Sequence, residues 1–268
     1  MQQAMIEQSF IFLPGVQQKT EQRLWEEGIR TWDDMLQATS VSGASSERLS
    51  FWKGRLRIAK SLLAKDPAAL ARLLGPRNTW RLYDHVLLEP RFLDIETTEY
   101  RSDITVVGIS DGEFYTALVK DRNLHAQALR KSLEGATCII TFNGASFDLP
   151  ILERAFPGAI PSVPHFDLRH ICTQAGLHGG LKRIEQHLGI SRPICIRDMD
   201  GTDAIMLWYR YRFGDEKALQ ELIDYNAADV LHLAPLAQQV IDQLWKQLRH
   251  NEQLSFAPLP RPSLQRQE

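Results

Sequence analysis

Arg91-Phe-Leu-Asp-Ile-Glu96 and the segments that follow it decide the fold. Apolar and acidic residues alternate in this first segment, which is typical of a strand with two different faces. Residues 104–109, 114–119 and 137–142 are also rich in β-branched and aromatic residues and are predicted to be strands. Asp111-Gly112 lies between the second and third strands and indicates a hairpin.

The segments between and after these strands have helical patterns. Helices are expected at about 121–134, 147–156, 181–188, 203–212 and 216–246. Strands first, and then strands alternating with helices, predict an α/β domain with a mixed sheet flanked by helices.

The remainder of the chain divides around this domain. Residues 1–78 have apolar residues at helical spacing and are expected to form a small all-α N-terminal region, which ends near Gly75-Pro76. The α/β domain is expected at 84–246. Residues 247–268 contain several prolines and are expected to be a flexible tail.

The composition is that of an ordinary globular protein. Of the 268 residues 44% are hydrophobic and 24% are charged, with a net charge of −2, which excludes a mainly disordered or membrane-embedded chain. The three cysteines form no C-x-x-C pair, which argues against a disulfide framework or a cysteine-rich zinc site. No apolar stretch is long enough to span a membrane, so a cytoplasmic location is expected.

Three acidic blocks carry the candidate chemistry. On a strand, Asp94 and Glu96 point to the same face, where two carboxylates repel each other unless a cation lies between them. Asp148 follows the strand at 137–142 at the start of a predicted helix, with Ser146 as the expected N-cap. Tyr225 and Asp229 are four residues apart and share one helix face.

Each block also has a structural explanation when it is taken alone. A D-x-E pair is common, Asp148 is favoured by the helix dipole, and Asp229 taken alone is better explained as a surface charge. Asp167 is either a residue that supports the site or a plain loop aspartate.

Together the blocks resemble the DEDDy 3′–5′ exonucleases of the ribonuclease H-like superfamily. Phe92-Leu-Asp-Ile-Glu-Thr97 is similar to their first motif, Asn143-Gly-Ala-Ser-Phe-Asp148 to the second and Tyr225-Asn-Ala-Ala-Asp229 to the third. The sister class has a histidine five residues before the last aspartate, where this chain has Asp224. The tract Gly179-Gly-Leu-Lys-Arg-Ile-Glu185, with Leu188-Gly-Ile190, further resembles the bacterial YprB-type proteins.

The resemblance implies a ribonuclease H-like fold and two divalent ions, Mg²⁺ or Mn²⁺, held by Asp94, Glu96, Asp148 and Asp229. It implies that Tyr225 orients the attacking water, since a phenol with an ordinary pKa near ~10 is a poor base. It also suggests Thr97, Asn143 and Phe147 as contacts to the substrate.

The N-terminal region carries a second set of expectations. Phe12-Leu-Pro-Gly-Val16 resembles part of a helix-hairpin-helix, which would bind nucleic-acid phosphates, although Gln17 replaces the usual second glycine. Plain helix packing explains the segment equally well. Residues 48–91 have ten basic and three acidic residues, and form either a solvated face or a track for a phosphate backbone with Phe51, Trp52 and Trp80 as stacking groups.

The sequence therefore predicts a metal-dependent 3′–5′ exonuclease that acts on single-stranded DNA or RNA. Two alternatives stay open: a catalytically silent nucleic-acid-binding module with the same fold, and a structure-specific endonuclease of DNA repair. Metal-dependent turnover and the size of the products separate the three.

Overall fold

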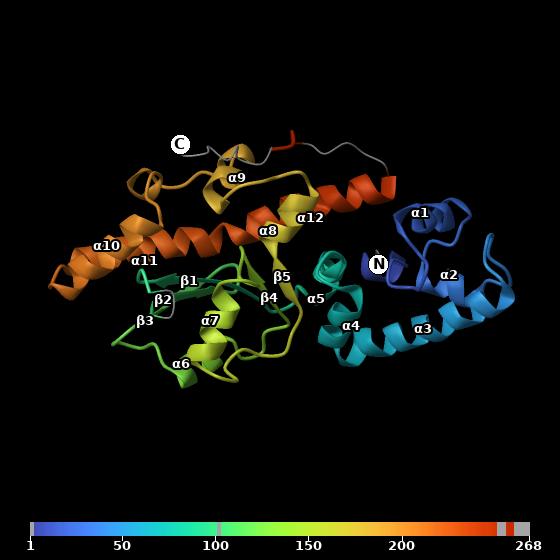
Figure 1. The fold of residues 1–268 in the computed structure, drawn as a ribbon, viewed down its shortest axis with the longest axis horizontal. Coiled ribbons are helices and arrows are strands. Elements are labelled where there is room, and N and C mark those ends of the chain that lie inside the picture. Colours follow the sequence, from blue (N-terminus) through green and yellow to red (C-terminus); the bar gives the residue numbers. More distant parts are fainter. Residues whose placement is uncertain (1–2, 101–102, 251–255, 260–268) are drawn as a thin grey trace, which may run out of the picture. The chain divides into compact units, whose positions relative to one another are not determined.

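The computed structural model describes residues 3–100, 103–250 and 256–259 and contains two compact units (Figure 1). One unit comprises the chain up to Leu88 together with the last helix from Leu244 onward. The other comprises Glu89 to Gln243 and the described residues 256–259. The tail predicted at 247–268 lies mostly outside the described residues.

The second unit is built on a five-stranded mixed sheet. Its order is β3-β2-β1-β4-β5, where β1 is antiparallel to β2 and parallel to β4. β2 and β3 form the predicted hairpin, and β4 and β5 are parallel. The strands are β1 Pro90–Thr97, β2 Ile104–Ser110, β3 Tyr115–Val119, β4 Cys138–Thr141 and β5 His165–Asp167.

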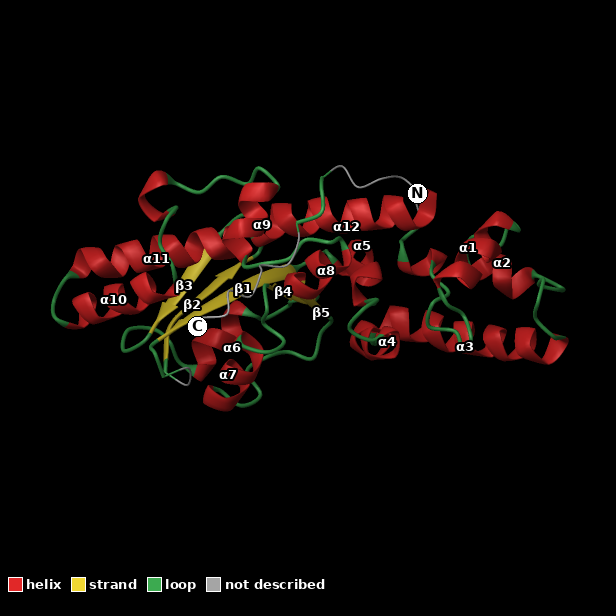
Figure 2. Ribbon diagram, turned by 45° about the horizontal axis from the view of Figure 1, so that its top comes forward, coloured by secondary structure: helices red, strands yellow, loops and turns green. Residues whose placement is uncertain are grey.

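Helices cover both faces of this sheet (Figure 2). One face packs on α6 (Ala126–Ser132) and α7 (Asp148–Ala155) through a core that includes Leu93, Ile95 and Val107. The other face packs on α10 (Gly201–Arg212) and α11 (Glu216–Leu231). The predicted mixed sheet with helices on its faces is confirmed.

The helices that follow β5 differ from the predicted ones in two places. The short strand β5 leads directly into α8 (Leu168–Gln174), and neither was predicted. The single helix expected at 216–246 is two helices, α11 and α12 (Leu233–His250). Pro235 explains the break, because it has no amide hydrogen to donate to the carbonyl four residues earlier. The other elements of this unit are α9 Leu181–His187 and η3 Ile194–Ile196.

The first unit is all-helical in the residues that the structure describes. Its elements are η1 Ile6–Gln8, α1 Gln18–Glu26, α2 Trp32–Gln37, α3 Ser46–Lys65, α4 Pro67–Leu74, η2 Thr79–Leu82 and α5 Tyr83–Val86, joined by the end of α12. Gly15 and Gly28 have φ angles of +80° and +90° and occupy the turns before and after α1, where residues with a Cβ are disfavoured.

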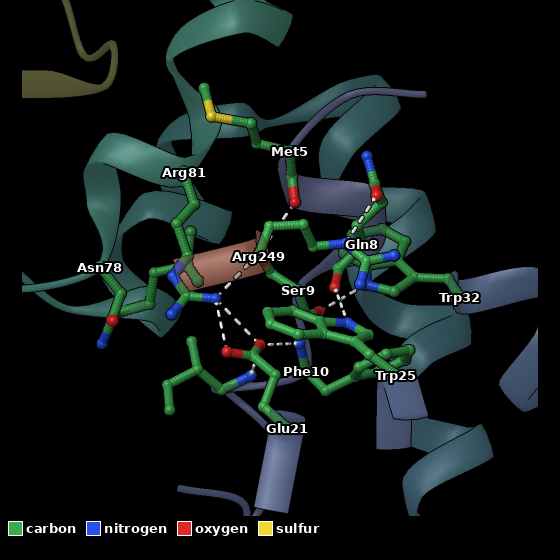
Figure 3. A network of polar contacts seen from close by, with 12 residues as sticks. Met5, Gln8, Ser9, Phe10, Glu21, Trp25, Trp32, Asn78, Arg81 and Arg249 are labelled. Carbon is green, nitrogen blue, oxygen red and sulfur yellow. Dashed lines mark hydrogen bonds and ion pairs between the residues drawn. The ribbon is translucent and has the colours of Figure 1, made fainter. Parts of the chain in front are cut away.

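A buried ion pair organises this unit (Figure 3). Glu21 of α1 is fully buried and accepts hydrogen bonds from the Phe10 and Ile11 amides and from Arg81 of η2. The Arg81 guanidinium also donates to Ser9 Oγ at 3.1 Å. The pair therefore ties three distant segments of the chain together, and removing one partner would leave a buried charge unpaired.

The expected stacking groups of this unit do not form a set. Trp52 and Trp80 are 2% and 4% exposed and lie within the core, where the Trp52 indole nitrogen donates a hydrogen bond. Phe51, in contrast, is 56% exposed. The prediction that Trp52 and Trp80 stack on bases is wrong, because both side chains are buried in the core of this unit. Within the part of the chain that the structure describes, every helix is too short or too polar to span a lipid bilayer.

Candidate metal and nuclease site

The site begins on the central strand β1. Asp94 and Glu96 share one face of the sheet, while Leu93 and Ile95 pack into the core on the other. On the neighbouring strand β2, Gly108 is paired with Asp94. The register shifts between Glu96 and Thr97, so the strand pairing becomes irregular immediately after the two carboxylates.

Helix α11 brings the third carboxylate to this face. Oxygens of Asp94, Glu96 and Asp229 lie within 4.8 Å of one another. Tyr225 and Asn226 lie one turn before Asp229 on the same helix and are buried against the sheet. The structure thus brings together residues from the first and third acidic blocks, which are more than 130 positions apart.

Asp148 joins the group from the opposite side of β1. Its Oδ1 accepts a hydrogen bond from the Ile95 amide at 3.0 Å, and the residue is 2% exposed. Strand β4 pairs with β1 only as far as Phe92, so the Ile95 amide lies beyond the last paired residue. The side chain of Asp148 therefore replaces a strand partner at the point where β1 carries the two other carboxylates.

The start of α7 differs from the sequence prediction. Phe147 rather than Ser146 is the N-cap residue, and its side chain caps no amide. Ser146 Oγ instead donates to the carbonyl and side-chain oxygens of Asn143. The prediction of a Ser146 cap is wrong because this serine closes the preceding turn.

Asp167 holds the turn between β4 and α7. Its carboxylate accepts hydrogen bonds from the amides of Asn143, Ala145 and Arg169 at 2.8–3.1 Å. Asn143 adopts a φ of +71°, a conformation that asparagine tolerates better than most residues. Of the two interpretations of Asp167, the structure favours support of the loop that leads to Asp148.

Asn226 connects the carboxylates to the sheet. Its amide nitrogen donates to Asp94 at 3.0 Å and to Glu96 at 3.3 Å, and its oxygen accepts from the Tyr115 hydroxyl at 2.9 Å. The residue is fully buried. The space that it occupies exists because Gly108 has no side chain: a Cβ there would lie 1.8 Å from the Asn226 amide oxygen.

Asp229 has a buried cationic partner. Arg192 forms an ion pair with Asp229 and donates to both oxygens of Glu185 at 2.5 and 2.8 Å. His232, three residues after Asp229, contacts Glu185 at 3.1 Å. These contacts form a polar network that links the end of α11 to α9 and to the loop after it.

Burial raises the pKa of each of the four carboxyl groups, and neighbouring negative charges add to the effect. Burial, followed by the neighbouring charges of Asp148, Asp229 and Glu96, raises the pKa of Asp94 well above its usual value. Burial also raises the pKa of Glu96 to about 8 and that of Asp148 to about 7. The pKa of Asp229 is raised by burial and lowered in part by Arg192.

Tyr225 remains a protonated phenol in this environment. Burial first, and then the charges of Asp229, Glu96 and Asp94, raise the pKa of its hydroxyl. The ammonium group of Lys182 lies 4.5 Å from the centre of its ring, within the range of a cation–π contact.

The three residues suggested as substrate contacts occupy different environments. Thr97 is half-buried at the end of β1, directly after Glu96. The side-chain oxygen of Asn143 accepts from Ser146 and from Arg169 at 2.8 Å. Phe147 packs partly buried against the core under α6 and α7.

The sequence analysis missed several residues of the site. Asn226 lies inside the third block, and Lys182 and Glu185 lie inside the tract that was quoted for its resemblance. The spacing of Asn226 and Asp229 places both near one helix face, which is the signal available from the sequence. Gly108, Tyr115 and Arg192 have no such signal, because only the folded sheet brings them to the carboxylates.

The donor set fits a hard divalent cation. Three carboxylates contribute oxygens within 4.8 Å of one another, and burial together with neighbouring negative charges raises the pKa of each. A divalent cation would stabilise the ionised forms that burial disfavours. Asp94, Glu96 and Asp229 are thus the residues suited to hold a metal ion.

Replacing Gly108 by alanine is expected to weaken metal binding. The new methyl group would displace the Asn226 amide, and loss of such supporting hydrogen bonds typically lowers metal affinity about 10- to 100-fold. Calorimetric titration with Mn²⁺ measures the change. Gly201→Ala is the matched control, since a Cβ at Gly201 meets no atom within 4 Å. Equal Mn²⁺ affinity of Gly108→Ala and wild type would contradict the role assigned to Asn226.

Without divalent ions, the free energy of unfolding is expected to fall as pH rises from about 5 to 8. The unfolded chain loses these carboxyl protons near pH ~4, whereas the raised pKa values keep them bound in the folded protein.

Asp94→Asn removes one of the repelling charges and is expected to stabilise the metal-free protein at pH 8 by about 1–2 kcal/mol. Urea unfolding in EDTA at several pH values measures both effects.

Asp224→Asn is the control for this experiment, because Asp224 is exposed on the same helix. It is expected to leave the pH dependence as in wild type. A metal-free protein that gains stability toward pH 8 would show that the carboxylates are not held in repulsion.

Comparison with known proteins agrees with this geometry. The family model described as the RNase H superfamily matches residues 91–241, which is more than half of the chain. Searches of the curated proteins and of the solved structures find no significant match. This match and the mixed five-stranded sheet confirm the predicted ribonuclease H-like fold. This fold indicates a nucleic-acid hydrolase that binds nucleic acid and uses divalent metal ions, with the acidic cluster as the candidate metal site. The chain belongs to the RNase H superfamily.

Proposed function

We propose that this chain is a metal-dependent 3′–5′ exonuclease of the DEDDy type, similar to the bacterial YprB-type proteins. The observation that carries the proposal is the convergence of Asp94, Glu96 and Asp229 within 4.8 Å, with Asp148 bonded to the same strand. Tyr225 stands one helical turn before Asp229, as the DEDDy pattern requires.

Two divalent ions would bind at this site. Asp94, Glu96 and Asp229 would hold them, and Asp148 would help to hold the second. When bound, Mg²⁺ or Mn²⁺ would supply positive charge that offsets the negative charge developing on the attacking and leaving oxygens of a phosphodiester. Asn226 would keep Asp94 and Glu96 in place through its two hydrogen bonds. Arg192 would do the same for Asp229.

Tyr225 would position the attacking water rather than remove its proton. Its raised pKa keeps the hydroxyl protonated and able to donate a hydrogen bond. The packing of its ring against Lys182 restricts the orientation of the phenol.

Three residues of the first two motifs are the proposed substrate contacts. Thr97 follows Glu96 directly and is the best placed of the three to touch a terminal nucleotide. The side chain of Asn143 is held by Ser146 and Arg169, and that of Phe147 packs against the core. Both residues would therefore act on the substrate through the loop that leads to Asp148.

The test uses the purified protein with Mg²⁺ or Mn²⁺ on 5′-labelled single-stranded DNA and RNA of equal sequence. We expect a ladder that shortens from the 3′ end and mononucleotide products. Asp94→Ala and Tyr225→Phe are expected to lower the rate, by more than about 1000-fold and about 10- to 100-fold respectively, since the first loses a metal ligand and the second a positioning group.

Asp224→Asn serves as the matched control and is expected to cleave as wild type does. EDTA should abolish cleavage. Internal oligomeric products would favour an endonuclease, and intact substrate with retained binding would favour a silent binding module; either result would contradict the proposal.

A further inference from the structure

A cavity lies beside Arg192, the ion-pair partner of Asp229. Its volume is about 380 Å³. Its lining includes the hydroxyl-bearing Ser191 and three cationic residues, Lys182, Arg192 and Arg197. Glu185 is the one acidic residue in the lining, and its two oxygens already accept hydrogen bonds from Arg192. The wall of the cavity therefore carries a surplus of positive charge.

Two buried donors in this wall have no hydrogen-bond acceptor among the described residues. They are Nζ of Lys182 and Nη1 of Arg192. The Arg192 side chain is 4% exposed, and its other nitrogens bind Glu185 and Asp229. Buried donors are nearly always satisfied in folded proteins, so an unmet pair at a cavity indicates a ligand that supplies acceptors.

The cavity shares residues with the carboxylate site. Arg192 contacts both the cavity and Asp229, and Lys182 contacts both the cavity and the ring of Tyr225. One side chain therefore separates the cavity from the carboxylate site, so a nucleic-acid strand bound at the carboxylates is long enough to reach the cavity.

We propose that this cavity binds a backbone phosphate of the nucleic-acid strand, next to the phosphodiester that is hydrolysed. The proposal rests on the function proposed above. A phosphate offers several anionic oxygens, which match the ammonium of Lys182 and the planar guanidinium groups of Arg192 and Arg197. No aromatic residue lines the cavity, so it offers no surface for base stacking. It positions the strand without reading its sequence.

The test measures binding of a fluorescent single-stranded oligonucleotide by anisotropy in EDTA, where no cleavage takes place, at several salt concentrations. Lys182→Gln and Arg197→Gln are each expected to weaken binding about fivefold and to reduce the slope of log K against log salt by about 0.7. Arg197 is exposed, so its replacement leaves the fold intact. Arg183→Gln removes the same charge from α9 outside the cavity and is the matched control; we expect wild-type binding from it.

A second arm neutralises single phosphates of the oligonucleotide as methylphosphonates. Wild type should lose affinity when one linkage near the 3′ end is neutral, and the Lys182→Gln and Arg197→Gln variants should be insensitive to that same substitution. Inorganic phosphate, added as a competitor, distinguishes a site for free phosphate from a site for the strand: weak competition supports the proposal.

Wild-type affinity and salt dependence in both cavity variants would overturn the proposal, as would variants that keep the full sensitivity to methylphosphonate. Cleavage by wild type in Mg²⁺ is measured on the same preparations. If wild type cleaves and the cavity variants bind normally, the phosphate site alone is wrong. If wild type neither binds nor cleaves, the proposed function fails and the phosphate site fails with it.

Discussion

Repulsion between buried carboxylates is the constraint on which the site depends. Asp94 and Glu96 on β1, Asp148 on α7 and Asp229 on α11 are held close together, and each has a raised pKa because of burial and its neighbours. A group of negative charges of this kind lowers the stability of the fold unless cations or hydrogen-bond donors compensate it. Most of the polar contacts around the site supply that compensation.

The compensation comes from segments far apart in the sequence. Asn226 donates to two carboxylates, the Ile95 amide donates to Asp148, and Arg192 pairs with Asp229. None of these donors neutralises the whole group, and the remaining negative charge makes the group a candidate site for a divalent ion. The resulting decrease in the free energy of unfolding is typical of carboxylates that are preorganised for a metal ion.

Much of the fold was predictable because its signals are local. Alternation in β1, the Asp111-Gly112 turn and the helical periodicity of α10 and α11 each depend on neighbouring residues. The short strand β5 was missed because three residues carry too little pattern. The buried state of Trp52 and Trp80 depends on tertiary packing, which the periodicity of one helix does not specify.

The candidate site was also predictable only in part. The four carboxylates and Tyr225 were predicted from motifs that resemble those of the DEDDy exonucleases, and the structure brings oxygens of Asp94, Glu96 and Asp229 within 4.8 Å of one another. The residues that support them were not found, because the pairing of Gly108 with Asp94 and the reach of Tyr115 to Asn226 exist only in the folded sheet. A glycine and a tyrosine in a strand carry no sign of such a role.

Anomalous diffraction from a crystal of the protein soaked in Mn²⁺ tests the central claim most directly. We expect a Mn²⁺ peak among the carboxylates of Asp94, Glu96 and Asp229, and no peak there in the Asp94→Asn variant. A crystal in which Mn²⁺ binds elsewhere, or leaves these three carboxylates empty at millimolar concentration, would contradict the account.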